Sequence, residues 1–229
     1  MSMINSLFGQ FSPDSIIFLP LQLIACFLAI SWWIFVFPTN FYNGHIYYIW
    51  NTVRSEVNKL LFNNNNEGSL TWIPTLTTVF FLILSINLLG LLPYAFTLTS
   101  HISFTYSLAI PLWLSINIIG FYTAFNSRLS HLVPQGTPGF LIPLMIWIET
   151  LSLIAQPIAL GLRLAANLTA GHLLIFLLST ATWILSTNPI ISGLTLIILV
   201  LLFILEIGVA CIQAYVFTSL VNFYLDQNI

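Results

Sequence analysis

Charged and hydrogen-bonding side chains interrupt two long apolar stretches near the end of this sequence, residues 141–185 and 190–225. These side chains belong to Glu149, Gln156, Arg163, Asn167, His172, Glu206, Gln213 and Asp226. The arginine keeps its proton at any ordinary pH, so its burial in hydrocarbon costs roughly 2.5–3.5 kcal/mol or more. Acids and histidines inside apolar helices are typical of ion pairing and proton relays.

The composition indicates a membrane protein. Of 229 residues, 59% are hydrophobic and 4% are charged, and the mean hydropathy is +1.00. A soluble domain carries about a quarter charged residues. The net charge of -2 excludes a nucleic-acid-binding surface. Cys26 and Cys211 lie in apolar stretches without metal-ligand spacing, and we expect buried free thiols.

The apolar segments predict an all-α membrane protein with about five membrane-embedded helices in a single domain, residues 1–229. Apolar residues recur at helical spacing over 45–62 between charged positions, which predicts an amphipathic helix on the membrane surface. The predicted membrane segments are 16–37, 72–96, 104–125, 141–185 and 190–225.

The segment 141–185 is too long for a perpendicular crossing. As one helix it would measure roughly 67 Å, against a hydrocarbon core of about 30 Å. It must therefore tilt, bend at Pro143 or Pro157, or split into two spans, and the good helix formers around Arg163 favour one tilted helix. Residues 186–189 form a polar turn, so 190–225 returns as the second half of a long antiparallel hairpin.

The basic residues predict the orientation. Arg54 and Lys59 follow the first span, and two further crossings bring Arg128 to the same side. The positive-inside rule makes that side the inner one. The amino terminus and the 186–189 turn then face outward, and the carboxyl terminus faces inward.

A hairpin centred near position 187.5 brings polar residues to matching depths, to within about one turn. The expected pairs are Arg163 with Gln213, His172 with Glu206, and Glu149 with Asp226. Helical phase places Arg163 on one face with three other polar residues and directs His172 to the opposite face. The residues that share the Arg163 face are Glu149, Gln156 and Asn167.

Small residues surround Arg163 on its helix, and they let another helix approach closely in lipid. They are Ala159, Gly161, Ala165, Ala166, Ala170 and Gly171. An arginine beside such a surface indicates that its carboxylate partner comes from another chain.

Three motifs carry a family resemblance: the run from Gly161 to His172, the run from Glu206 to Phe217, and the run from Asn87 to Tyr94. Together with the order of the spans, they resemble subunit a of the F-type ATP synthase in its mitochondrial form. The His172 and Glu206 combination resembles the mitochondrial branch, since bacterial members often exchange the two residue types.

The resemblance implies a stator subunit that has no catalytic site or cofactor of its own and couples proton flow to ATP synthesis. It implies two offset proton half-channels beside a rotating c-ring, in the mitochondrial inner membrane. Protons would pass His172 and Glu206 on the outer side and Glu149 and Asp226 on the inner side. Arg163 would face the carboxylate of the c-ring. Supporting polar residues would be Asn167, Gln213, Gln156 and Asn87. Subunit b and small membrane subunits would be further partners.

Other interpretations remain open from the residues alone. Arg163 could be a structural ion-pair partner of Glu206 or Glu149, and each acid, like His172, could be a satisfied core group. The chain could also be a proton-pumping or ion-coupled transporter subunit of another complex, although it shows no internal repeat. An intramembrane enzyme lacks any recognisable motif.

Overall fold

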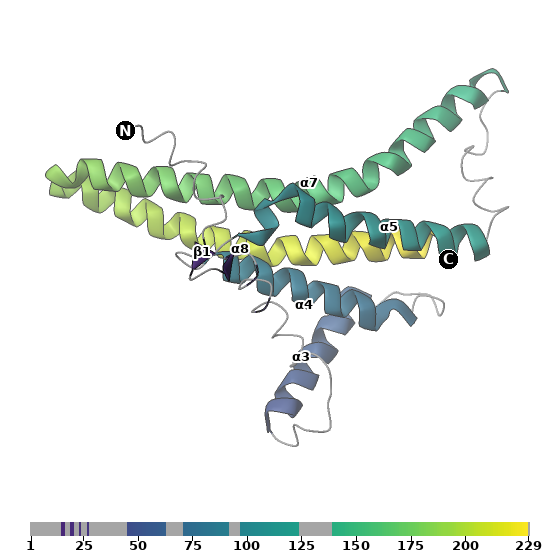
Figure 1. Ribbon diagram of the computed structural model, residues 1–229, viewed down its shortest axis with the longest axis horizontal. Helices are drawn as coiled ribbons and strands as arrows, with labels where there is room; N and C mark the ends of the chain where they lie inside the picture. The colour runs from purple at the N-terminus through teal and green to yellow at the C-terminus, as the bar shows by residue number, and fades with distance from the viewer. Residues whose placement is uncertain are drawn as a thin grey trace.

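The computed structural model describes residues 15–16, 19–20, 23, 27, 45–62, 71–91, 97–123 and 139–228. Two strands of two residues each, β1 (Ser15–Ile16) and β2 (Leu19–Pro20), pair antiparallel. The other described elements are helical (Figure 1). They are α3 (His45–Phe62), α4 (Ile73–Gly90), the 3₁₀ helix η3 (Leu98–Ser100), α5 (Ile102–Thr123), η4 (Gly139–Leu141), α7 (Ile142–Ile184), η5 (Leu185–Thr187) and α8 (Pro189–Asn228).

Four of the described helices are long and apolar enough to cross a membrane: α4, α5, α7 and α8. The predicted all-α membrane class is therefore confirmed. The predicted first span, 16–37, lies mostly outside the described residues. Ile16 itself belongs to β1, and Leu23 and Phe27 are helical.

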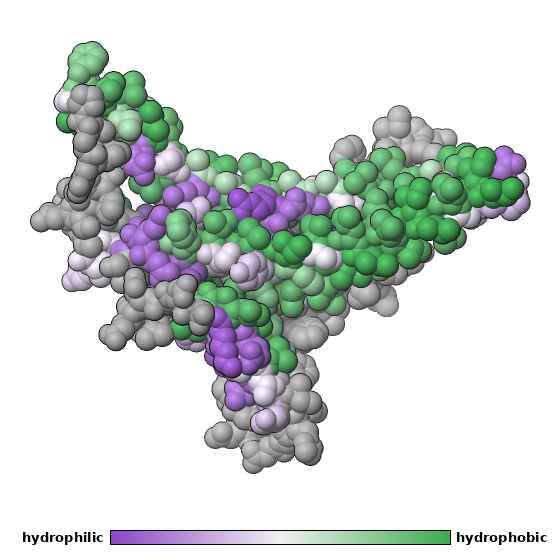
Figure 2. All heavy atoms as spheres, turned by 180° about the vertical axis from the view of Figure 1, so that it is seen from behind, coloured by the Kyte–Doolittle hydropathy of each residue, from purple (hydrophilic) through white to green (hydrophobic). Residues whose placement is uncertain are grey.

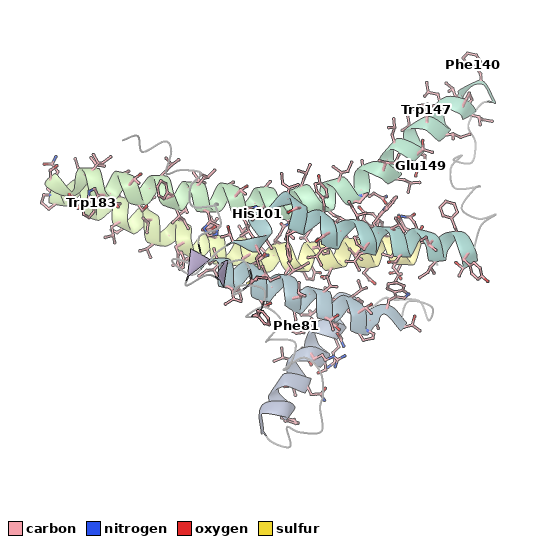
Figure 3. The ribbon with its side chains drawn as sticks, in the orientation of Figure 1. Phe81, His101, Phe140, Trp147, Glu149 and Trp183 are labelled. Atoms are coloured by element: carbon pink, nitrogen blue, oxygen red, sulfur yellow. The ribbon has the colours of Figure 1, made fainter. Side chains whose placement is uncertain are left out.

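The helix α7 is one continuous 43-residue helix, as the sequence favours over two separate spans. It bends, and the arm that carries Phe140, Trp147 and Glu149 leaves the other helices (Figures 1 and 3). Pro143 lies in the first turn, where proline is harmless, whereas Pro157 lies inside the helix. Its ring removes a backbone hydrogen bond and crowds the preceding turn, which explains the bend.

The core forms where α4, α5, the middle of α7 and the C-terminal half of α8 pack together. Its most buried side chains include Leu76, Ile83, Ile116, Leu164 and Phe217. The opposite part of the hairpin extends beyond α4 and α5 to Trp183 (Figure 3). On the face that Figure 2 shows, this part is largely hydrophobic except at its tip, as expected for a segment in lipid.

Cys211 is a free thiol, as expected, but it is exposed on α8. The expectation of burial is therefore wrong for this residue. An apolar helix in a membrane protein faces lipid as well as core, so apolar surroundings in the sequence do not predict burial in the chain. Cys26 lies outside the described residues.

Two contacts join α5 to α7 on either side of Pro157. The indole Nε1 of Trp113 donates a hydrogen bond of 3.2 Å to Oε1 of Gln156. One turn beyond the proline, Gly161 lies against the ring of Tyr106, where an added Cβ would be 2.7 Å from Cδ1. The missing side chain lets the two helices approach closely.

This close approach predicts that Gly161→Val destabilises the α5 and α7 packing. A branched side chain would overlap the flat face of the Tyr106 ring, and such overpacking costs about 1–3 kcal/mol. The midpoint of thermal dissociation of the detergent-solubilised complex should fall. Gly193→Ala is the control, because no atom lies within 4 Å of the added Cβ there. Equal midpoints for the two variants would contradict the packing argument.

Candidate functional site

Two side-chain contacts fix the register of the α7 and α8 hairpin. Nε2 of His172 lies 4.0 Å from Oε1 of Glu206, and Nδ2 of Asn167 donates a 2.7 Å hydrogen bond to Oε1 of Gln213. Half the sum of the residue numbers is 189 for the first pair and 190 for the second. The hairpin centre therefore lies about two residues later than predicted, within the one-turn tolerance. The helical turn η5 and the start of α8 at Pro189 account for the shift.

Glu206 occupies a buried seat between α7 and α8. The residue is only 4% exposed, and both carboxylate oxygens are buried without a hydrogen bond to any described residue. A Cβ added to Gly171 would lie 2.5 Å from Oε1. The absence of a side chain at Gly171 therefore makes the room for the carboxylate beside His172.

Asn87 joins α4 to the same region of α8. Its Nδ2 donates a 3.4 Å hydrogen bond to the carbonyl of Ala210, and the residue is fully buried. Because Ala210 and Glu206 are four residues apart, they share a face of α8. Asn87 thus lies one helical turn from the Glu206 level.

Arg163 has no counterion among the described residues. Its Nη1 is buried, and neither a hydrogen bond nor an ion pair connects the guanidinium with the described part of the chain. The interpretation of Arg163 as a structural partner of Glu206 or Glu149 is therefore unsupported. Instead, Glu206 lies beside His172 on the other face of α7.

The face of α7 that carries Arg163 includes exposed small residues beside the arginine. Ala159, Ala166 and Ala170 are exposed, while Leu160 and Leu164, on the neighbouring face, are buried in the core. Arg163 is half-buried at the boundary between the two faces. Another helix could therefore come close to the guanidinium.

Gln213 lies within about one turn of the depth of Arg163, as expected, but its side chain binds Asn167. No hydrogen bond within the described part of the chain joins either amide to Arg163. With the later hairpin centre, Arg163 on α7 lies at the depth of a residue on α8 that is about one turn past Gln213. Gln156, on the Arg163 face, binds Trp113 of α5.

The depth estimate places Glu149 and Asp226 at one level, and it does not predict a contact between them. Glu149 is exposed on the arm of α7 that leaves the bundle (Figure 3). Asp226 is half-buried with a buried Oδ1, near the end of α8. The estimate assumes straight helices, and the bend near Pro157 violates that assumption.

Sequence reasoning missed the roles of Trp113, Tyr106 and the buried polar residues around η3. A tryptophan or tyrosine in an apolar span carries no signal of its own, since its partner lies on a distant helix. The sequence shows the polar residues in 97–103, but it does not show that residues 97–100 are buried.

The sequence profile described as ATP synthase A chain matches residues 17–226. ATP synthase subunit a of Pisaster ochraceus is 62% identical over 226 residues, which cover 99% of each chain. The protein of the same name from Paracentrotus lividus is 61% identical over 230 residues, covering 100% of this chain and 99% of the relative. ATP synthase F(0) complex subunit a of Scyliorhinus canicula is 44% identical over 229 residues, covering 99% of this chain and 100% of the relative. The chain therefore belongs to the ATP synthase A chain family.

Proposed function

We propose that this chain is the proton-translocating stator subunit of a mitochondrial F-type ATP synthase. Family membership favours this function over a transporter subunit of another complex. The single observation that carries the mechanism is the half-buried arginine, with a buried Nη1, that has no acid partner among the described residues of its own chain.

Arg163 faces a carboxylate that each subunit of the c-ring carries past it. The small residues Ala159, Ala166 and Ala170 let the ring helix approach. A fixed positive charge in a medium of low dielectric constant favours the ionised form of that carboxylate, so a proton is released as the carboxylate arrives. Arg163 cannot relay protons itself, so it also blocks a direct leak between the two half-channels.

The outer half-channel delivers protons at the His172 and Glu206 pair. Their 4.0 Å separation allows a proton to pass between the imidazole and the carboxylate directly or through one water molecule. The pair lies on the far side of α7 from Arg163, so an arriving proton does not meet the guanidinium first. Asn87, Asn167 and Gln213 supply fixed hydrogen-bonding groups between these levels.

The inner half-channel releases protons past Glu149 and Asp226. Glu149 is open to its surroundings on the diverging arm of α7, on the same helical face as Arg163. This position suits the last acid before the inner water. Asp226 lies near the inner end of α8 and serves the same exit as a second acid.

The chain lies in the mitochondrial inner membrane, with its amino terminus outward and its carboxyl terminus in the matrix. Arg54 and Lys59 on α3 and Arg128, which follows α5 in the sequence, anchor the matrix side. The surface helix α3 carries an exposed Lys59 and Glu56 pair at 2.8 Å. This helix lies on the membrane beside the other stator subunits, among them subunit b and small membrane subunits.

Arg163→Ala tests the proposal in the assembled complex. Proton-driven ATP synthesis should fall about 100-fold or more, as when a preorganised charge is removed from a reaction site. The passive proton leak should not fall with it, because the barrier between the half-channels is lost. Lys59→Ala is the control and should synthesise ATP at the normal rate. Normal synthesis by assembled Arg163→Ala would refute the proposal.

Gly171→Ala tests whether the position of the Glu206 carboxylate beside Gly171 matters for proton transfer. The added methyl would lie 2.5 Å from Oε1 of Glu206 and must push the carboxylate away from His172. Synthesis should drop about tenfold or more, since a displacement of about 1 Å is enough to disturb proton transfer. The shorter acid in Gly171→Ala with Glu206→Asp should recover part of the rate. Gly208→Ala is the control, because its Cβ meets no atom within 4 Å. Full activity of Gly171→Ala would show that the seat does not matter.

A further inference from the structure

Part of the segment between α4 and α5, Thr97 to His101, contains the buried polar residues Thr97, Thr99 and Ser100, and we call this part the polar link. Thr97, Thr99 and Ser100 are at most 8% exposed, and Nε2 of His101 is buried. This burial is unexpected for a connecting loop, because loops normally run over the surface of a protein.

Part of the polar link is satisfied by its own hydrogen bonds. Oγ of Ser100 lies 2.8 Å from Oγ1 of Thr97 and donates a 2.6 Å bond to the Thr97 carbonyl. Thr99 differs, because its hydroxyl is completely buried and has no hydrogen bond to any described residue. A buried hydroxyl in this state is costly unless it binds water or another polar species.

The packing places the polar link at the depth of Glu206. Figure 1 shows α4 lying along α8, with the C terminus of α8 at the end away from η3. The hydrogen bond of Asn87 places it at the depth of Ala210. Because α4 and α8 run in opposite directions, one turn forward along α4, at Gly90, is near the depth of Glu206, one turn back along α8. Thr97 packs on Gly90, with its Cγ2 3.5 Å from where a Cβ would be.

The polar link also packs against α7, the helix that carries Gly171 and His172. Figure 3 shows His101 at the start of α5, far from Trp183 at the hairpin tip. Three fully or nearly buried groups around this level have an oxygen without a hydrogen bond in the described chain: Thr99, Asn87 and Glu206. An unsatisfied oxygen on each of three helical elements suits a shared hydrated path.

We propose that the polar link is the outer segment of the proton path to Glu206, with Thr99 as a fixed hydrogen-bonding group and His101 as a proton relay. This inference rests on the proposed function, since it assumes that protons reach Glu206 from the outer side. At each hop the donor loses one N–H or O–H bond and the acceptor gains one. The proton ends on the Glu206 carboxylate or the His172 imidazole.

Thr99→Val in the assembled complex tests this path. Valine keeps the shape and removes a hydroxyl that makes no hydrogen bond with the described chain, so a structural role predicts unchanged assembly and unchanged rate. A conduit role predicts normal assembly and proton-driven synthesis reduced about fivefold, the change expected from losing one hydrogen bond in a transfer step. His101→Leu should reduce the rate at least as much. His101→Gln, whose side chain is polar but cannot take up a proton, should give a rate between those of His101→Leu and the parent.

Thr77→Val is the matched control, because Thr77 is equally buried on α4 but its hydroxyl donates to the carbonyl of Pro74. Accessibility provides a second measurement that does not depend on the valine variant. Silver ion added from the outer side should inhibit Thr99→Cys and leave Thr77→Cys and the parent complex active. Normal synthesis by Thr99→Val, or silver-insensitive Thr99→Cys, would overturn the inference.

Glu206→Gln separates failure of this inference from failure of the proposed function. If Glu206→Gln is inactive while the Thr99 and His101 variants behave as the parent, protons reach Glu206 by another route. If Glu206→Gln synthesises ATP normally, the proposed function itself fails, and this inference fails with it.

Discussion

A permanent positive charge in an apolar helix needs a negative partner, and the described part of this chain does not supply one to Arg163. Because a guanidinium cannot shed its charge, the cost of burial persists until a carboxylate arrives from outside the chain. The arrangement of α7 serves this requirement. Its core face packs on α5 and α8 through large apolar residues, while the Arg163 face carries the exposed small residues Ala159, Ala166 and Ala170.

The surrounding contacts hold α7 in place without forming hydrogen bonds to Arg163. The Trp113 hydrogen bond to Gln156 and the Tyr106 ring against Gly161 fix α5 on either side of Pro157. The amide pair of Asn167 and Gln213 sets the hairpin register. In lipid such packing and hydrogen bonds replace the hydrophobic effect as the source of helix association. The same contacts leave Glu206 in its own seat beside His172, away from Arg163.

Much of the fold could be predicted from the sequence, because the length, hydropathy and periodicity of a segment predict a helix. The helix over 45–62 has the same bounds in the structure, and the pairing of His172 with Glu206 follows from the hairpin alone. The site was less predictable where geometry departs from straight helices. The bend near Pro157 takes the arm that carries Glu149 away from the other helices (Figure 3), and η5 shifts the register by about two residues. Contacts between distant helices, such as Trp113 with Gln156, leave no trace in a single sequence.

The central claim is that a carboxylate-bearing helix of the c-ring meets Arg163 on its open face. Disulfide formation tests it most directly, using a complex in which Cys26 and Cys211 are replaced by serine. A cysteine at exposed Ala166, beside Arg163, should cross-link to a cysteine placed one turn from the ring carboxylate. A cysteine at Ile158, exposed but on another side of α7, should not cross-link. Cross-linking from Ile158 and none from Ala166 would contradict the account.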